Sequence, residues 1–268
     1  MKQYGLLGYP LSHSFSRRYF TDKFNREAID AQYENYAIPS IEQLPRLIVE
    51  NPLLTGLNVT IPYKQAVMPY LDALDSEAEA IGAVNTIRIE RGENKKPRLI
   101  GYNSDLTGFR ESIRPFVEKM RNQSQIYFTD KVSSCQGAAL KALILGTGGA
   151  SKAIGHALKQ LGIEILFVSR TSEPGRVTYK NLDRHFYEEY HIIINTTPLG
   201  MYPNVQTCPP INYPAVGPGH LFFDAVYNPE KTLFLQKGEE QGATIKNGME
   251  MLHLQAEASW KIWNPGID

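Results

Sequence analysis

The stretch LILGTGGASKAIGHAL, residues 143–158, decides the fold that we predict for this chain. It consists of an apolar run, a glycine-rich turn and an amphipathic segment, which is the order strand, turn and helix of a dinucleotide-binding unit. Gly146 permits the tight turn, and Gly148 lets backbone amides approach a pyrophosphate at the positive N-terminus of the helix. The third glycine position of the GxGxxG pattern holds Ser151, which is small. We predict a nucleotide-binding turn; a glycine turn that only ends a strand is the alternative.

The sequence around this turn alternates apolar runs with helical stretches. The runs are continuously apolar, which predicts strands buried on both faces of a parallel sheet. They cover residues 141–146, 164–169, 190–196, 220–227 and 243–247. Helical stretches at 150–161 and 231–241 separate several of them. The pattern predicts a doubly wound α/β domain.

The end of the second predicted strand indicates which nucleotide binds. A site that prefers NAD usually places Asp or Glu about 20 residues past the glycines, where it bonds the ribose hydroxyls. Here the strand ends in VSRTS, residues 168–172, which sets Arg170 between the hydroxyls of Ser169 and Thr171. An arginine and two hydroxyls suit a 2′-phosphate, and Arg170 could also stack on adenine. NADP is therefore favoured over NAD, with a solvated surface arginine as the alternative.

The rest of the chain predicts a second α/β region. Strands are predicted over residues 4–8 and 33–38, a hairpin over 83–103, and helices over 16–29, 105–120 and 249–263. Ser40 with Gln43 resembles a capping box that opens a helix running through Val49. Residues 121–137 are polar and predict an irregular linker or surface insertion.

The stretch GLNVTIPYK, residues 56–64, predicts a strand that stops at a proline. Its alternation puts Leu57, Val59 and Ile61 on a core face, and Asn58 and Thr60 on a polar face. Just past the proline corner the chain presents Lys64. An amide, a hydroxyl and an ammonium so close together indicate a binding site for a small polar molecule.

Composition excludes several classes of function. The chain has 268 residues, 42% of them hydrophobic and 21% charged, as expected of a globular protein with one large or two smaller domains. Lys+Arg and Asp+Glu are equal at 28 each, so no global basic field exists to hold nucleic acid or an anionic membrane. Only two cysteines occur, at 135 and 208, and the six histidines are scattered, so we predict reduced thiols and no metal site. Without a signal-peptide pattern or an apolar stretch of about 20 residues, we expect a cytoplasmic protein.

Taken together, the motifs of this chain resemble those of the shikimate dehydrogenase family. They occur in the family's order and span nearly the whole chain. The matching stretches are GYPLSHSFS (8–16), NVTIPYK (58–64), GAVNT (82–86), NSD (103–105), GTGGASKA (146–153), NTTPLGM (195–201), YNP (227–229) and GMEMLHLQA (248–256).

The departures from the family pattern are few. Arg17 stands where a proline usually follows the first motif, and Ser169 stands where the cofactor loop usually begins with Asn. A second arginine of that loop is not at its expected place, where Glu173 and Pro174 stand and Arg176 only follows. These departures weaken the case for strict NADP specificity.

The resemblance implies the substrate, 3-dehydroshikimate, and a role for particular residues. Lys64 and Asp105 match the catalytic pair. Substrate contacts are implied for Ser14, Ser16, Asn58, Thr60, Asn85, Tyr227 and Gln255. Cofactor contacts are implied for Gly146, Thr147, Gly148, Gly149, Ala150, Ser169, Arg170, Thr171, Thr196, Ala225 and Gly248. Taken singly, Ser16 could cap a helix, Asn85 could satisfy a turn and Gln255 could be a helix-surface amide.

The catalytic pair has a chemical rationale. Reduction of a ketone by hydride leaves negative charge on oxygen, which needs a proton and a nearby positive group. Lys64 can supply both, and in reverse a neutral lysine accepts the alcohol proton. Desolvation in a closed cleft would favour that neutral form, whereas a carboxylate partner would oppose it. Asp105 is therefore expected to orient Lys64 and to bind substrate hydroxyls; a solvated surface lysine is the alternative.

The prediction is an NADPH-dependent shikimate dehydrogenase with two α/β domains. Residues 1–108 with 249–268 would form the substrate domain, and residues 109–248 the Rossmann-type NADP domain. By resemblance, the final helix returns to the first domain. We expect a small-molecule substrate and a monomer or homodimer. The rivals are a quinate/shikimate dehydrogenase using NAD and a catalytically silent nucleotide-sensing module; retention of Lys64 and Asp105 argues against the sensor.

Overall fold

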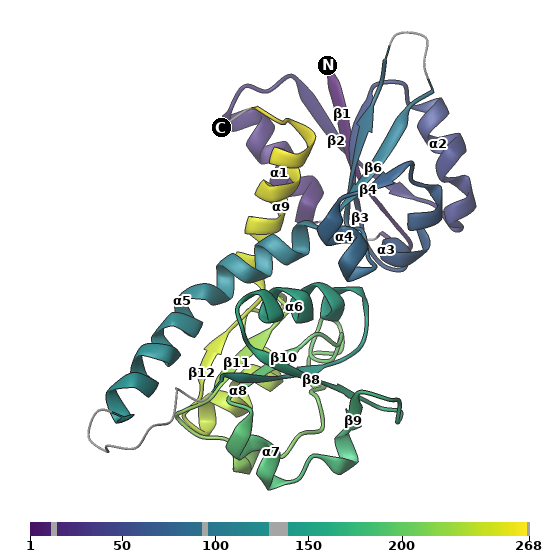
Figure 1. Ribbon diagram of the computed structural model, residues 1–268. Helices are drawn as coiled ribbons and strands as arrows, with labels where there is room; N and C mark the ends of the chain where they lie inside the picture. Colours follow the sequence, from purple (N-terminus) through teal and green to yellow (C-terminus); the bar gives the residue numbers. More distant parts are fainter. Residues whose placement is uncertain (12–14, 93–95, 129–138, 267–268) are drawn as a thin grey trace. The chain divides into compact units, whose positions relative to one another are not determined.

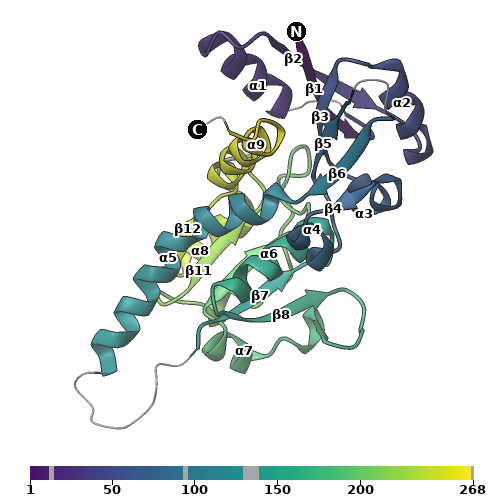
Figure 2. The same ribbon diagram turned by 45° about the horizontal axis from the view of Figure 1, so that its top comes forward.

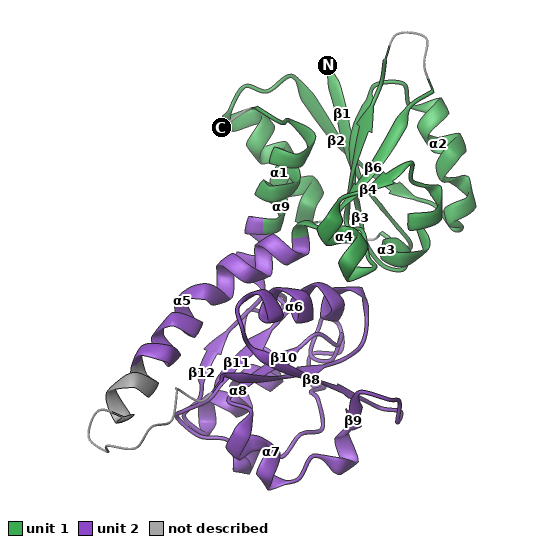
Figure 3. Ribbon diagram, in the orientation of Figure 1, with its two compact units in different colours: residues 1–104, 255–268 green, residues 105–254 purple. Residues whose placement is uncertain are grey.

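The computed structural model describes residues 1–11, 15–92, 96–128 and 139–266. Its contacts divide the chain into two compact units (Figure 3). The first comprises Met1–Ser104 with Gln255–Asp268, and the second comprises Asp105–Leu254. The sequence predicted the divisions after residues 108 and 248. Each unit is described by itself below.

The first unit is built on a mixed sheet. Within the described residues it has six strands in the order β2-β1-β3-β5-β6-β4. Their bounds are β1 Lys2–Gly8, β2 Ala31–Ala37, β3 Leu54–Val59, β4 Ala73–Leu74, β5 Thr86–Glu90 and β6 Arg98–Tyr102. β1 pairs in parallel with β2 and β3, whereas β5 pairs antiparallel with β3 and β6. The strands β5 and β6 confirm the predicted hairpin.

Helices cover both faces of this sheet, because alternate residues of a strand point to opposite faces. Leu57 packs in a cluster with α2, and Tyr4 packs in another cluster with α1 and α9. In Figure 1, α1 and α9 lie side by side, and Lys23 Nζ lies 3.1 Å from the carboxylate of Glu257. The helices are α1 Phe15–Arg26, α2 Leu44–Glu50, α3 Tyr63–Ala66, α4 Ser76–Ile81 and α9 Met249–Trp263.

The closing helix α9 is fixed to the sheet by a close backbone approach. A Cβ at Gly56 of β3 would lie 2.4 Å from the indole of Trp263, so only glycine fits there. The Trp263 Nε1 donates to the carbonyl of Ile87, at 3.0 Å. The C-terminal segment therefore belongs to the core of the first unit.

The second unit is a parallel sheet with the doubly wound order. Within the described residues it has six strands in the order β12-β11-β10-β7-β8-β9, all paired in parallel. Their bounds are β7 Lys141–Leu145, β8 Glu164–Ser169, β9 Arg176–Thr178, β10 Ile192–Asn195, β11 Leu221–Asp224 and β12 Thr244–Lys246. The winding reverses between β7 and β10, which is the switch point where such folds bind ligands. The predicted doubly wound fold is confirmed.

The second sheet is buried on both faces, as its continuously apolar strands predicted. Leu143 and Leu145 pack with residues of α7 and α8. The ring of Phe223 packs against that of Phe109 in α5, with the ring centroids 4.9 Å apart. Figures 1 and 2 show α6 and α7 on opposite faces. The helices are α5 Ser104–Phe128, of which Ser104 belongs to the first unit, α6 Gly149–Gln160, α7 Arg184–Glu189 and α8 Leu233–Glu240.

Three local predictions need correction. Residues 121–128 are helical, as the end of α5, so the irregular segment predicted over 121–137 is wrong there, and its remainder from 129 lies outside the described residues. Ile61 is 74% exposed, because β3 ends at Val59 and the alternation stops with it. Ser40 accepts from the amide of Glu42 and so caps a 3₁₀ turn, Ile41–Gln43, ahead of α2.

The short elements β9 and α7 were not predicted. Their sequences, RVT and RHFYEE, are short and largely polar, so they lack the apolar period on which sequence prediction depends.

Candidate functional site

The glycine turn lies at the switch point of the second unit. Gly146 has φ of +114°, and a Cβ there would lie 2.6 Å from the Thr196 hydroxyl. The N-cap of α6 is Gly148, and no side chain of the described residues caps that helix by a hydrogen bond. A Cβ added at Gly148 would meet no described heavy atom within 4 Å. The first-turn amides therefore have the open, uncapped geometry that fits a pyrophosphate.

Other predicted cofactor residues gather at the same carboxyl edge of the sheet. The amide and hydroxyl of Thr196 both donate to the carbonyl of Leu145, at 2.9 and 2.8 Å. Ala225 directly follows β11, and a Cβ at Gly248 would lie 2.4 Å from its carbonyl oxygen. The structure thus brings Gly146, Thr196, Ala225 and Gly248 together within one unit.

The end of β8 carries the predicted 2′-phosphate contacts. Ser169 is buried and its hydroxyl donates to the carbonyl of Thr171, whereas the Arg170 and Thr171 side chains are exposed. Burial raises the pKa of Tyr179 to about 12, and the nearby charge of Arg170 opposes that rise. An exposed cation beside a hydroxyl is what an incoming phosphate needs.

In the first unit, the segment after β3 meets the loop after β1. Thr60 is half-buried, and a Cβ at Gly8 would lie 2.5 Å from its methyl group. Lys64 is half-buried in α3, and its carbonyl accepts from the amide of Val84, at 2.7 Å. The first residues of the motif GYPLSHSFS, Gly8 and Tyr9, therefore lie against the motif NVTIPYK, where the Tyr9 amide donates to the carbonyl of Ile61 at 3.2 Å.

Three hydroxyls meet in the interior of the first unit. Thr86 at the start of β5, Ser104 at the start of α5 and Ser259 in α9 are almost completely buried. Their oxygens lie 3.0 Å apart for Thr86 and Ser104, 2.9 Å for Thr86 and Ser259, and 2.9 Å for Ser104 and Ser259. Ser259 also donates to the carbonyl of Gln255. We call these three side chains the hydroxyl cluster.

The predicted amides Asn85 and Gln255 attach to the hydroxyl cluster. Asn85 is buried; its Nδ2 donates to Ser104 Oγ at 3.0 Å, and its Oδ1 accepts from the amide of Ser104 at 2.6 Å. The Ser104 hydroxyl lies 3.4 Å from Gln255 Oε1. Gln255 is only 7% exposed, so the alternative of a helix-surface amide is wrong. Asn85 also accepts from the amide of Ser104 at the start of α5, which agrees with the alternative that Asn85 satisfies a turn.

Asn58 joins the same network from the other side. Its Nδ2 donates to Ser259 Oγ at 2.8 Å, and its Oδ1 accepts from the Tyr33 hydroxyl at 2.8 Å. Tyr33 is buried, which raises the pKa of its phenol, while a hydrogen bond with Ser16 opposes the rise. Ser16 lies within α1, one residue after its start. The structure thus joins three predicted substrate residues, Ser16, Asn58 and Asn85, through side chains of the interior.

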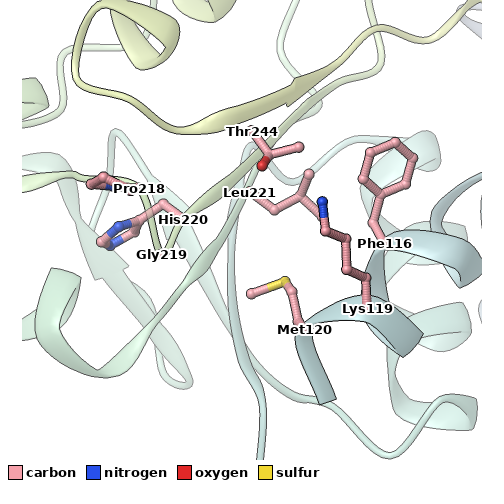
Figure 4. A pocket seen from close by; sticks show the side chains of 8 residues that line it. All are labelled: Phe116, Lys119, Met120, Pro218, Gly219, His220, Leu221 and Thr244. Atoms are coloured by element: carbon pink, nitrogen blue, oxygen red, sulfur yellow. The ribbon is translucent and has the colours of Figure 1, made fainter. Parts of the chain in front are cut away.

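A cavity elsewhere in the second unit is separate from these groups. It measures about 190 Å³ and is lined by residues of α5 and by the first residues of β11 and β12, among them Lys119, His220 and Thr244 (Figure 4). The cofactor residues follow the opposite, carboxyl ends of these parallel strands. His220 is buried, which lowers its pKa, and its Nε2 lies 2.8 Å from the carbonyl of Tyr187.

The described residues contain neither a metal-ligand cluster nor a helix that could span a membrane. No three His, Cys, Asp or Glu side chains in that part of the chain form a group able to hold a metal ion. None of its helices combines the length and apolar character needed to cross a membrane.

Comparison with known proteins identifies the family. Residues 6–87 match the sequence profile described as the shikimate dehydrogenase substrate binding domain. A shikimate dehydrogenase (NADP(+)) of Clostridium beijerinckii is 38% identical over 272 residues, covering 98% of this chain and 92% of the relative. The chain belongs to the shikimate dehydrogenase family.

Solved structures of this family share the fold. Shikimate dehydrogenase 1 from Peptoclostridium difficile matches with a TM-score of 0.76 at 34% identity, over 100% of this chain and 94% of that one. The shikimate 5-dehydrogenase of Thermus thermophilus, in complex with NADP(H) and shikimate, matches with a TM-score of 0.78 at 27% identity, over 98% and 94%.

The remaining predicted residues of this family member are placed as follows. Asp105 is buried in the first turn of α5 and is the next residue after Ser104. Tyr227 is half-buried in the loop after β11, and burial raises its pKa. Thr147, Gly149 and Ala150 lie in the glycine turn and the start of α6. Ser14 lies outside the described residues.

Sequence reasoning missed Tyr33, Thr86, Ser104 and Ser259. Two of them were adjacent to predicted residues, since Thr86 follows Asn85 and Ser104 precedes Asp105. Ser259 stands four residues after Gln255, which puts both on one helical face. That spacing could have identified Ser259 from the sequence, whereas no pattern in the sequence pointed to Tyr33.

Proposed function

We propose that the protein is an NADP-dependent shikimate dehydrogenase that catalyses the reversible reduction of 3-dehydroshikimate to shikimate. The observation that carries the proposal is the buried network of the first unit, in which the motif residues Asn58, Asn85 and Gln255 attach to one hydroxyl cluster. Ser16 is joined to this network through Tyr33, which donates to Asn58. The near full-length likeness to NADP(+)-dependent shikimate dehydrogenases supports it. The reaction belongs to aromatic amino acid and chorismate biosynthesis.

The second unit is proposed to hold the NADP. The open, uncapped start of α6 would receive the pyrophosphate, with Gly146, Thr147, Gly148, Gly149 and Ala150 around it. The 2′-phosphate would lie against the residues that end β8, which are Ser169, Arg170 and Thr171. Thr196, Ala225 and Gly248 would line the remainder. The bound nucleotide supplies the hydride.

The first unit is proposed to bind the substrate and to move the proton. Ser14 and Ser16 would grip the carboxylate, and Asn58, Thr60, Asn85 and Gln255 would bond the ring substituents. Tyr227, which belongs to the second unit, is proposed as a further substrate residue on the family resemblance alone. Lys64 Nζ would donate the proton to the carbonyl oxygen and accept it in the reverse direction. Asp105 is the first residue of the second unit. On the family resemblance, its carboxylate, acceptor-only when ionised, would orient Lys64 and bind substrate hydroxyls.

A relaxed nucleotide preference is the second candidate. Arg176 lies 2.5 Å from the carboxylate of Glu173, so its charge is already paired on the protein. Arg170 would then bear the 2′-phosphate contact without a second arginine. Such a site would use NAD as well, as the quinate/shikimate rival requires.

One assay separates these possibilities. Oxidation of about 1 mM shikimate, at the upper end of common KM values, is followed with NADP⁺ and with NAD⁺, and quinate replaces shikimate in parallel. The proposal expects the highest kcat/KM for shikimate with NADP⁺. Equal kcat/KM values for the two nucleotides would establish the relaxed preference. If the protein binds the nucleotide but oxidises neither acid, the catalytically silent sensing module is the remaining interpretation.

We also propose that the enzyme acts in the cytoplasm as a monomer or homodimer. Cys208 is a free thiol, which agrees with a reducing compartment. Light scattering behind a size-exclusion column would measure the mass in solution, and a mass above that of a dimer would reject this part.

A further inference from the structure

A fully buried carboxylate lies at the switch point of the second unit. Asp224, the last residue of β11, has no exposed surface. Its Oδ1 accepts from Asn195 Nδ2 at 2.9 Å and from the amide of Val226 at 3.0 Å. Its Oδ2 accepts from the Thr232 hydroxyl at 2.5 Å. Three donors on three different segments therefore converge on one side chain.

The carboxylate fixes the direction of the hydrogen bonds beyond it. An ionised carboxylate only accepts, so the Nδ2 end of Asn195 must face Asp224. The Oδ1 end of Asn195 then accepts from the amide of Thr197 at 3.0 Å and from its hydroxyl at 2.6 Å. A flipped Asn195 amide would set a donor against each of these donors. Asp224 thus helps to hold the loop after β10 in one conformation, together with the Leu199 carbonyl, which accepts from the same Asn195 Nδ2 at 3.3 Å.

This loop carries the groups that approach the glycine turn. Thr196, between Asn195 and Thr197, is the residue whose hydroxyl donates to the carbonyl of Leu145 directly before the turn. On the other side of Asp224, the amide of Ala225 donates to the carbonyl of Asn195 at 2.9 Å. The loops after β10 and β11 are therefore held to each other around a single charge.

We propose that Asp224 is a positioning residue for the nucleotide, whose ionised carboxylate holds Thr196 and Ala225 at the switch point in the arrangement that NADP binds. The proposal rests on the proposed function for the identity of the nucleotide. Asp224 has no exposed surface and acts through Asn195 and the backbone.

A merely structural role is disfavoured by the environment of the charge. Burial raises the pKa of Asp224 to about 6, so the ionised form is held against a desolvation cost. Within the described part of the chain, Tyr213 is coupled to this charge: burial raises the pKa of the Tyr213 phenol, and the charge of Asp224 adds to the rise. A fold that needed only three hydrogen bonds would be served as well by a neutral amide.

The test compares Asp224→Asn with Asp183→Asn in the full chain. Asp183 is an exposed N-cap of α7 in the same unit, and Asn caps equally well, so this control loses one charge away from the switch point. NADP⁺ binding is titrated by calorimetry at pH 7.5. We expect Kd to rise on the order of 10-fold in Asp224→Asn, to stay unchanged in Asp183→Asn, and Tm to be retained or raised in both. An unchanged Kd in a folded Asp224→Asn protein overturns the proposal.

Two further readouts keep the test decisive. Thr197→Val removes one donor to Asn195 Oδ1 while Asp224 stays ionised, and it should weaken NADP⁺ binding by a few-fold; if Asp224→Asn does not fold, an unchanged Kd in this variant overturns the proposal. Between pH 7.5 and 5.5, NADP⁺ affinity should fall more steeply in the wild type than in Asp224→Asn. The 2′-phosphate titrates in both proteins, whereas Asp224 takes up a proton only in the wild type. Parallel slopes contradict the role of the charge. Binding without shikimate turnover would reject the proposed function alone.

Discussion

The two units place their predicted site residues by opposite electrostatic means. In the first unit, the hydroxyl cluster and its amides are all uncharged, and in the Thr86–Ser104 pair either oxygen can be the donor. In the second unit, the carboxylate of Asp224 receives three donors and donates nothing. A neutral network can exchange its protons without moving its atoms, whereas an acceptor-only centre permits a single arrangement.

This difference agrees with the chemistry proposed for each unit. A ring with hydroxyls and a ketone exchanges one donor for one acceptor when it is oxidised or reduced, and a network of hydroxyls can follow that exchange. A nucleotide keeps the same phosphates throughout, so a fixed set of loops suffices. The comparison predicts that changes in the two networks will affect binding, while the proton transfer will depend on neither.

Lys64→Ala tests the last statement and should have the largest effect. Removal of a positioned acid–base group lowers kcat by about 10²–10⁴-fold. The KM for shikimate should change far less, because the predicted binding residues remain. Steady-state kinetics in both directions measure the two constants.

Lys159→Ala, at an exposed lysine near the end of α6, is the matched control and should leave kcat unaltered. A folded Lys64→Ala protein with near-wild-type kcat would sink the proposed mechanism and leave Lys64 as a binding or surface residue.

The second prediction concerns the cost of the charge at Asp224. Its pKa of about 6 in the folded protein lies above the ordinary 3.8, so the folded state binds the proton more tightly than the unfolded state. The resulting stabilisation is fully present below about pH 4 and is lost as pH rises through 6. The wild type should therefore lose up to about 3 kcal/mol relative to Asp224→Asn between pH 4 and pH 7. Urea unfolding of both proteins across this range gives the difference, and a constant difference would contradict the shifted pKa.

The sequence predicted the fold of the second unit better than its binding network. Continuously apolar runs and the glycine turn predicted the parallel sheet, because burial on both faces leaves a pattern in consecutive residues. Asp224 has no such pattern around it, because its partners are not at a helical or strand spacing. Asn195 is its neighbour only through the order of the strands, and Thr232 only through the path of a loop. The same limit hid Tyr33 and Thr86 in the first unit, whose partners are distant in sequence. Ile61 was assigned to the core because alternation cannot show where a strand ends.

Arg170→Ala tests a residue at the edge of the second unit that is proposed to contact only the 2′-phosphate. Arg170 is exposed, outside the network of Asp224, so it should affect a single phosphate rather than the loops. A hydrogen-bonded charge pair is worth about 1.5–3 kcal/mol, so the KM for NADP should rise roughly 10-fold or more while NAD use is nearly unchanged. Initial rates with both nucleotides measure this. An equal loss with both nucleotides would indicate a role in adenine stacking or folding and would reject 2′-phosphate recognition.

Ser259→Ala should have the smallest effect and the clearest control. Ser259 donates to the carbonyl of Gln255 one turn earlier, and Ser112, in α5, is likewise buried and donates to the carbonyl of Phe109. Both substitutions remove a buried helical hydroxyl, but only Ser259 also accepts from Asn58 Nδ2 and contacts the hydroxyl cluster. Asn58 Nδ2 would keep only its 3.4 Å contacts with the Asn85 carbonyl and the Thr86 hydroxyl. The loss of its shortest hydrogen bond should cost about 1–3 kcal/mol of stability, against about 1 kcal/mol for Ser112→Ala.

The kinetic signature of Ser259→Ala separates positioning from stability. Ser259→Ala removes the hydrogen bond from Asn58 Nδ2 to the Ser259 hydroxyl, so the Asn58 amide is held less firmly. The KM for shikimate should therefore rise roughly 3- to 10-fold with kcat nearly constant, as expected when ground-state and transition-state binding weaken together. Ser259→Thr keeps the hydroxyl, so its KM for shikimate should lie between that of Ser259→Ala and that of the wild type. Equal KM values in Ser259→Ala, Ser112→Ala and the wild type would show that the neutral network supports the fold alone, and the contrast between the two units would then be one of stability rather than of binding.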